Sequence, residues 1–385
     1  MCLSYQVLIF IHAGTTGLIV PVMTLMFLQH GASLNTLSLF VALFSLTVLL
    51  TEIPSGIFAD TYGRKKCFLL SLIFLICKDS FLLISNDPIL LSVSCIFFGL
   101  GNAFSSGSLE ALIIDQYKST VGVVRINSQM FFLESIGMAA GALLGGFLGS
   151  IGTRYCPLIA VVLAFEIFIF ILSQIFLKEQ LCTEDRKETG SLKANFIHMF
   201  SGKNYSHSVK MILTATVFIG ILQTVLDVYW QQTFVTYMPS DFLYLIGVIS
   251  CMGFAGLIAG NYFVEWILTQ KVYKEKTIYW VFKFLLPVSM LLLGFCQNWI
   301  LFGCSYTFVH FIIGCGEVSE KAILHQNVDD SQRSSVLSIY SFIIRIGGIF
   351  SSLLCSFLVR HYGLSSVWIV IPAAALLALS LIRRK

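Results

Sequence analysis

The sequence predicts an all-α membrane protein in which twelve transmembrane helices form two pseudo-symmetric bundles of six. Hydrophobic residues make up 57% of the 385 residues and charged residues only 11%, whereas soluble proteins carry about 25% charged residues. Apolar runs long enough to cross a bilayer core of about 30 Å recur along the chain. One long polar stretch, residues 178–208, divides these runs into six and six.

Each apolar run is expected to form one helix, because lipid leaves backbone groups to be satisfied within their own segment. The chain is thus divided into a first bundle at 1–177, a cytoplasmic linker at 178–208 and a second bundle at 209–385. The predicted spans are 4–28, 35–58, 67–85, 89–114, 128–151, 155–177, 209–236, 241–268, 276–296, 299–323, 334–359 and 364–382.

The basic residues are distributed unevenly between the two sides of this arrangement. Of the 24 lysines and arginines, Arg154 and Arg360 are the two in loops on one side, and four are placed inside the membrane, namely Lys78, Lys283, Lys321 and Arg345. The remaining 18 lie on the other side. Because basic loops stay in the cytoplasm, the asymmetry predicts a multi-pass cell-membrane protein with both termini cytoplasmic.

Several classes of function are excluded by what the sequence lacks. Eleven cysteines lie mostly inside apolar runs, with no CxxC pair or Cys/His cluster, so neither a disulfide framework nor a metal site is expected. The chain has no GxxxxGK[ST] motif and no nucleophile–base spacing within its helices. No cofactor, no nucleic-acid partner and no enzymatic activity are therefore expected.

A short basic connection follows the second apolar run and has to turn the chain straight back. Gly56 is expected to admit a neighbouring backbone, Gly63 permits the turn, and Arg64 and Lys65 mark the cytoplasmic face. Asp60 needs a partner, because a carboxylate at a helix C-terminus faces the negative end of the helix dipole.

This spacing, G-x-x-x-D-x-x-G-R-K, resembles the signature loop between helices 2 and 3 of the major facilitator superfamily of transporters. The resemblance implies two homologous six-helix halves around a central cavity, and a loop that gates and does not bind substrate. An internal repeat agrees with it, since sliding the sequence by 210 residues aligns Glu110 with Glu320, Gln116 with Gln326, Ser128 with Ser338 and Gly137 with Gly347.

The fifth predicted helix carries glycines four residues apart, at Gly137, Gly141 and Gly145, followed by Gly146. Glycines at this spacing lie on one helix face and allow close contact with a partner helix. The same spacing resembles the antiporter motif of drug–proton exporters in the superfamily, with Ala142 in place of that family's proline.

Acidic residues end the fourth predicted helix and begin the fifth. Asp115 is expected at the membrane edge, paired with Arg64 as part of the gate. Glu110 and Glu134 enter to a similar depth, and two facing carboxylates in a low dielectric favour protonation of one of them. They are therefore candidates for carrying a proton. The alternative for Glu110 is a purely structural role, in which it forms hydrogen bonds only with helix ends or serines.

The second half contains further candidates. Arg345 is expected to pair with Glu317 or Glu320, because a buried arginine without a carboxylate is costly. In the seventh helix, an aspartate near mid-membrane is by default a functional candidate. The polar residues of that helix that are predicted to face substrate or protons are Gln223, Asp227, Trp230 and Gln231.

The function follows from the resemblance. The chain is predicted to be a monomeric secondary transporter that exports amphipathic, drug-like molecules in exchange for protons by alternating access. An importer of a small polar solute driven by protons is the alternative, and a non-transporting membrane receptor is a third. Glu166 and the neighbours Lys78 and Asp79 are intramembrane charges to which the sequence assigns no role.

Overall fold

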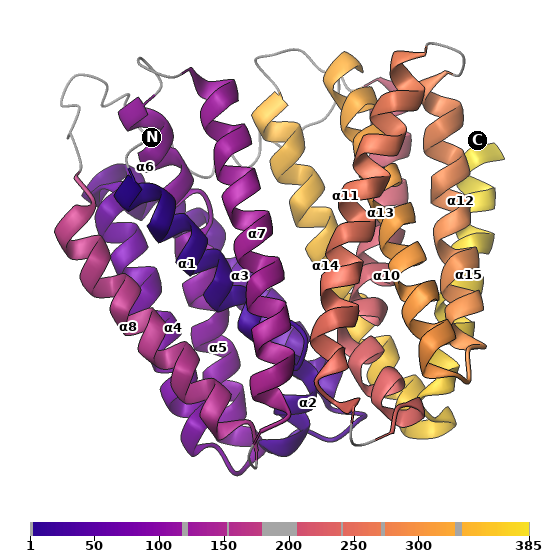
Figure 1. The fold of residues 1–385 in the computed structure, drawn as a ribbon. Helices are drawn as coiled ribbons and strands as arrows, with labels where there is room; N and C mark the ends of the chain where they lie inside the picture. The colour runs from indigo at the N-terminus through magenta and orange to yellow at the C-terminus, as the bar shows by residue number, and fades with distance from the viewer. Residues whose placement is uncertain are drawn as a thin grey trace. The chain divides into compact units, whose positions relative to one another are not determined.

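The computed structural model describes residues 3–117, 122–151, 154–178, 206–239, 242–270, 274–327 and 333–384. All regular structure in these ranges is helical (Figure 1). Eleven of the described spans are long and apolar enough to cross a membrane, and a bent pair of helices near the N-terminus passes the same test together. The fold class predicted from the sequence is therefore confirmed.

The chain divides into two compact units. The first contains Met1–Leu181 with Gln231–Cys251, and the second contains Cys182–Trp230 with Met252–Lys385. Two helices, α10 (His207–Tyr237) and α11 (Leu245–Thr269), contribute to both units. The boundaries predicted from the sequence, 1–177 and 209–385, remain a prediction, and most of the linker lies outside the described residues.

The first unit begins with a departure from the predicted single helix over 4–28. The structure has α1 (Leu3–Ile19) and α2 (Met23–Gln29), bent by 52° at the break between them. Pro21 lies in this break, and proline offers no N–H and disfavours a helical conformation in the residue before it. The Val22 N–H instead closes a tight turn onto the Ile19 carbonyl at 3.0 Å.

The rest of the first unit follows the predicted spans closely. Its helices are α3 (Leu37–Tyr62), α4 (Arg64–Ile84), α5 (Pro88–Ser105), α6 (Ser108–Tyr117), α7 (Val123–Gly149) and α8 (Cys156–Phe176). The predicted span 89–114 is interrupted between α5 and α6, where Gly107 has φ +70°. At the start of α5, the Asp87 carboxylate accepts hydrogen bonds from the N–H groups of Ile89 and Leu90 at 2.8 and 2.9 Å, which caps this helix.

Helix α7 packs directly onto α1 through its glycines. A Cβ on Gly141 would lie 2.1 Å from the Gly14 carbonyl oxygen, and one on Gly145 would lie 2.0 Å from that of Leu18. No side chain fits at such distances, so the two backbones touch. The predicted packing of the glycine face of this helix is confirmed.

The second unit repeats this contact between its own first and fifth helices. Besides parts of α10 and α11 it contains α12 (Glu275–Gly294), α13 (Trp299–Asn327), α14 (Arg333–Tyr362) and α15 (Ser365–Arg384). A Cβ on Gly347 of α14 would lie 2.4 Å from the Val217 carbonyl oxygen of α10. Gly137, its partner in the internal repeat, lies against Phe10 of α1 in the same manner.

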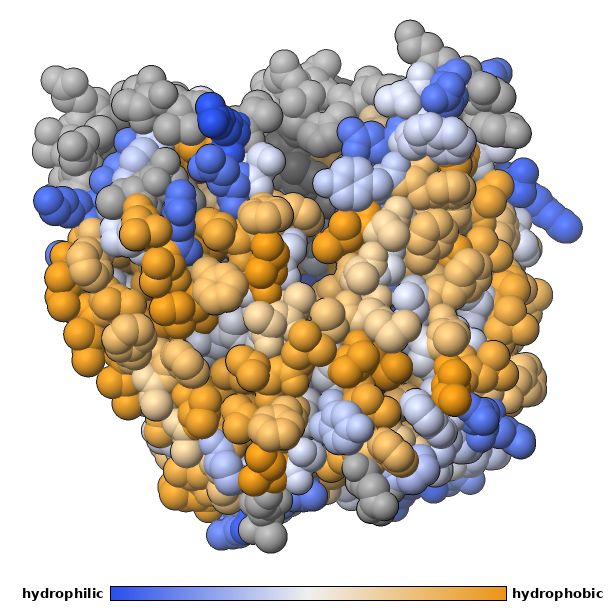
Figure 2. Space-filling view, in the orientation of Figure 1, coloured by the Kyte–Doolittle hydropathy of each residue, from blue (hydrophilic) through white to orange (hydrophobic). Residues whose placement is uncertain are grey.

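Apolar side chains cover the middle of the helices on the face seen in Figure 2, and hydrophilic side chains gather at the helix ends. On α7, Phe131 and Phe147 are each 56% exposed. Large exposed apolar side chains along a helix suit contact with lipid tails.

Candidate substrate, gating and proton sites

The loop between α3 and α4 is fixed to two other helices of the first unit. Gly63 ends α3 with φ +103°, a conformation that favours glycine. Arg64 then forms the expected ion pair with Asp115 of α6 and donates a hydrogen bond to the Ala111 carbonyl at 2.9 Å. Lys65 Nζ donates to the Gln174 carbonyl of α8 at 3.0 Å. These contacts join the turn to α6 and α8.

The role expected for Gly56 is wrong in this structure. Nothing described lies within 4 Å of a Cβ placed on it. The close contact with α5 is made instead by Ser55, whose hydroxyl donates to the Ala103 carbonyl at 3.0 Å. One residue further along a helix points about 100° away, so Gly56 faces outward. Asp60 is also exposed.

The glycine face of α7 has two different neighbours. Gly137, Gly141 and Gly145 lie against α1. Gly146 lies against Gly247 at the start of α11, where a Cβ would be 2.5 Å from the Gly247 nitrogen. Ala142 is fully buried, and α7 runs unbroken through it.

The two carboxylates at the α6–α7 end of the first unit lie near one another. Glu110 is exposed and Glu134 is half-buried, and the charge of Glu110 acts on Glu134. The two carboxylates are thus within electrostatic reach of one another, and their role in carrying a proton stays a prediction.

The polar residues predicted on one face of α10 have different surroundings. Asp227 is exposed, and it lies close enough to Tyr306 for its charge to act on the Tyr306 hydroxyl. Trp230 is buried and packs on the Tyr306 ring, with centroids 4.5 Å apart. Gln231 belongs to the first unit, where its side chain donates to the Val20 carbonyl at 2.7 Å and accepts from the Thr24 N–H at 2.8 Å. Asp227 and Trp230 thus share an aromatic neighbour, while Gln231 bridges the break between α1 and α2.

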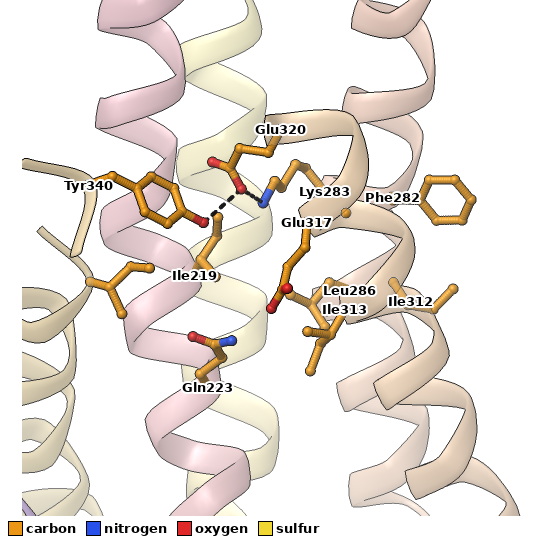
Figure 3. Close-up of a pocket in the computed structure, with 12 residues that line it drawn as sticks. Ile219, Gln223, Phe282, Lys283, Leu286, Ile312, Ile313, Glu317, Glu320 and Tyr340 are labelled. Atoms are coloured by element: carbon orange, nitrogen blue, oxygen red, sulfur yellow. Dashed lines mark hydrogen bonds and ion pairs between the residues drawn. The ribbon is translucent and has the colours of Figure 1, made fainter. Parts of the chain in front are cut away.

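Gln223 lines a cavity of about 130 Å³ within the second unit (Figure 3). The cavity also receives Glu317, and its wall holds an ion pair that the sequence did not predict, between Lys283 Nζ and Glu320 Oε2 at 2.7 Å. Tyr340 donates to the same carboxylate at 3.1 Å. Apart from this group, the lining is mainly isoleucine, leucine and phenylalanine.

The charged group in this cavity is almost completely dehydrated. Lys283 and Glu320 are 5% and 1% exposed. Glu320 accepts a further hydrogen bond from Thr216 at 3.0 Å, so both of its oxygens are occupied. Sequence reasoning assigned Glu320 or Glu317 to Arg345. Lys283, which lies among apolar residues in the middle of α12, was the available signal for the partner that the structure gives Glu320.

A second buried charge cluster lies in the first unit. Lys78 Nζ of α4 is 2.9 Å from an oxygen of its neighbour Asp79 and 3.6 Å from an oxygen of Glu166 on α8. All three residues are at most 5% exposed. The three charges left unassigned by the sequence therefore form one group.

In the described residues, apolar helical spans enclose buried charges and a cavity, which is typical of polytopic membrane proteins that transport solutes. Residues 7–323 match the profile of the Major Facilitator Superfamily. The chain belongs to this superfamily. It is a multi-pass membrane transporter of small molecules and not an enzyme.

Two groups of known proteins are similar to it. An uncharacterized MFS-type transporter, YxaM of Bacillus subtilis (strain 168), is 22% identical over 384 residues, which cover 95% of this chain and 91% of the relative. Multidrug resistance protein 2 of the same organism is 26% identical over 250 residues, covering 61% of this chain and 59% of that protein. Multidrug resistance protein 1 is 25% identical over about half of each chain, 48% and 47%.

Among solved structures, the nucleoside transporter NupG superposes with a TM-score of 0.84 at 11% identity, over 99% of this chain and 98% of that chain. A D-xylose–proton symporter gives 0.71 at 14% identity, over 98% and 95%. At such low identity these likenesses establish the fold alone.

Proposed function

We propose that this transporter exports amphipathic, largely apolar small molecules in exchange for protons, by alternating access. The observation that carries the proposal is its similarity to two multidrug resistance proteins, which spans about half of their length. The glycine face of α7, which resembles the antiporter motif, supports it. In this proposal the protein works as a monomer in the plasma membrane, with both termini in the cytoplasm.

The cavity in the second unit supports a substrate that is mainly apolar with one polar end. Its lining is mainly aliphatic and aromatic, with Gln223, Glu317 and the Lys283–Glu320 pair at one place. Drug-sized sites have volumes of about 300–1,000 Å³, so a cavity of about 130 Å³ would hold only part of such a molecule. The gate formed by Arg64 and Asp115 would then control access without contacting substrate.

Coupling to protons requires a carboxylate that can be protonated and reached by water. Asp227 fits this requirement, because it is an exposed carboxylate in the middle of a span, and charges at that depth face a polar path or partner and not lipid. The Glu110–Glu134 pair is the second candidate.

The polar groups of the same cavity favour a second function, proton-coupled import of a small polar solute. Such a site needs several buried polar side chains, and Lys283, Glu320, Tyr340 and Gln223 would supply them.

Purified protein in liposomes tests the proposal. With an acidic interior and a panel of lipophilic cations and antibiotics outside, we expect one compound to dissipate the pH gradient faster than in protein-free liposomes. Protein-free liposomes are the essential control, since lipophilic amines cross bilayers unaided. Dissipation only by sugars, peptides or organic anions, with the acidic side outside, would replace export by import.

The variant Asp227→Asn separates the two candidate proton sites. Loss of gradient dissipation, with substrate binding retained, would assign coupling to Asp227. Unchanged dissipation would remove Asp227 from that role and direct attention to Glu110 and Glu134.

A further inference from the structure

Helices α4 and α8 bury three charges together. Lys78 and Asp79 are adjacent in α4, and Glu166 reaches them from α8. Both carboxylates lie against the same ammonium nitrogen, at 2.9 and 3.6 Å, so they lie near one another. Lys78 lies over the Phe98 ring of α5, with Nζ 5.2 Å from the centroid. The lysine is thus held between two carboxylates and an aromatic face.

The charges in this group do not balance. One lysine and two carboxylates leave one negative charge, and charges are costly to bury without compensation. The described hydrogen bonds do not compensate it either. Apart from the Lys78 ammonium, 2.9 Å from one Asp79 oxygen, no hydrogen-bond donor among the described residues reaches the buried oxygens of Asp79 or the second oxygen of Glu166. A carboxylic acid proton shared between Asp79 and Glu166 would remove the charge and give one oxygen a donor.

A small cavity gives this group contact with a polar space. It has a volume of about 70 Å³ and is lined by Lys78 and Glu166 together with His12, Thr15 and Thr16 of α1. Liquid water takes about 30 Å³ per molecule, so the cavity has room for about two. The threonine hydroxyls donate to the helix carbonyls of Ile11 and His12, which leaves their oxygens free to accept from water.

We propose that Lys78, Asp79 and Glu166 form a proton-binding site, in which the two carboxylates share one proton taken up from water in the cavity beside His12. The site rests on the proposed proton coupling and places a proton in the first unit. The other titratable groups that line the cavities next to it are His12 of α1 and Cys95 of α5. Release of the proton leaves the buried group with its negative charge, so occupancy would be linked to conformations that differ in hydration.

Infrared spectroscopy of the purified full-length protein tests this site without any substrate. A protonated carboxylic acid has a carbonyl band distinct from the carboxylate bands, and the band shifts in heavy water. Relative to wild type at neutral pH, Glu166→Gln and Asp79→Asn should each lose the intensity of a single acid, because the remaining carboxylate pairs with Lys78. Glu265→Gln, which alters an exposed carboxylate, should leave the band unchanged.

Removal of the lysine should act in the opposite direction. Lys78→Met leaves two carboxylates without a cation, so the band should gain the intensity of one acid. The double variant Lys78→Met with Glu166→Gln should return to the wild-type intensity, since one carboxylate and no cation again require one proton. This reversal does not follow from a merely structural salt bridge.

Unchanged intensity in Glu166→Gln, Asp79→Asn and Lys78→Met would overturn the proposal. Size-exclusion chromatography and circular dichroism identify any variant that does not fold, and the double variant supplies the test if one single variant is lost. Because the spectra need neither substrate nor gradient, failure here is distinct from failure of the liposome experiment. A proton site could exist without drug export, and export could use another site.

Discussion

Lys283 and Glu320 form a buried ion pair, in which each charge compensates the other. Glu320 also accepts from Thr216 and Tyr340, so the carboxylate is held as an anion by three donors. Replacing Lys283 by methionine would leave this anion buried without a cation. Breaking a buried pair in this way costs about 3–5 kcal/mol, whereas removing both charges costs much less.

We therefore expect Lys283→Met to lower the free energy of unfolding by about 3–5 kcal/mol. The double variant Lys283→Met with Glu320→Gln should recover most of this loss. Denaturant unfolding in detergent micelles, followed by helical circular dichroism, measures both. A loss below about 1 kcal/mol for the single variant, the range of exposed pairs, would contradict a charged Glu320.

His30 provides a prediction about pH outside the membrane spans. It is fully buried at the end of α2, and its Nδ1 donates to the Met26 carbonyl at 2.9 Å. Burial lowers the pKa of His30 below its ordinary value of 6.5; the Met26 hydrogen bond raises it, and the charge of Arg154 lowers it further. The unfolded chain therefore binds the proton more readily than the folded protein.

The contribution of His30 to the free energy of unfolding should accordingly be constant above about pH 6.5. It should fall as the pH drops from there towards the lowered pKa of the folded protein. The thermal unfolding midpoint, measured between neutral and acidic pH, should decline less steeply in His30→Gln than in wild type. His207→Gln removes an exposed histidine and should keep the wild-type slope. Equal slopes in wild type and His30→Gln would contradict this prediction.

At the scale of single elements, the contact between α1 and α7 is the most sharply defined. Gly141→Ala would bring a methyl group to 2.1 Å from the Gly14 carbonyl oxygen, so the helices would have to separate. We expect a lower thermal unfolding midpoint. Gly56→Ala is the matched control, because it has open space in the same kind of helix and alanine favours a helix over glycine by about 1 kcal/mol. A midpoint for Gly141→Ala equal to that of Gly56→Ala would contradict the contact.

The sequence predicted this contact because glycine spacing carries the information directly. The break in the first span was not predicted, although Pro21 was visible. Pro54, Pro287 and Pro372 lie inside the continuous helices α3, α12 and α15, since a helix can tolerate proline when its freed carbonyl finds another donor. Whether a proline ends a helix depends on which groups lie near the freed carbonyl in the folded protein, and the sequence alone does not identify these groups.

Over the whole molecule, an ion pair could be predicted from the sequence only where the depth of the two residues in the membrane is enough to identify them as partners. Arg64 and Asp115 both lie at the end of a span, and their pairing was expected. Lys78 with Glu166, and Lys283 with Glu320, depend on which helices are neighbours, and the sequence contains no such information. The internal repeat shows the same limit. Its Gly137–Gly347 match corresponds to equivalent helix contacts, whereas exposed Glu110 and buried Glu320 have different surroundings.

The orientation of the whole chain depends on the bent pair α1–α2. Helix α1 has 17 residues, about 25 Å at 1.5 Å per residue, and α2 has seven. A hydrocarbon core is about 30 Å thick, so neither helix spans it comfortably and the two together do. If the pair crosses, twelve spans place both termini on one side; if it turns back within the membrane, eleven spans place them on opposite sides.

We expect both termini on the cytoplasmic side, because 18 of the 24 basic residues then face the cytoplasm. Peptide tags at the N- and C-terminus, probed with added protease, test this. Both tags should be protected in intact cells and cleaved in inverted membrane vesicles, while a tag inserted after Arg154 should be cleaved in intact cells. Cleavage of only the N-terminal tag in intact cells would mean that α1 and α2 form a re-entrant segment, and the two halves of the protein would then contain five and six spans.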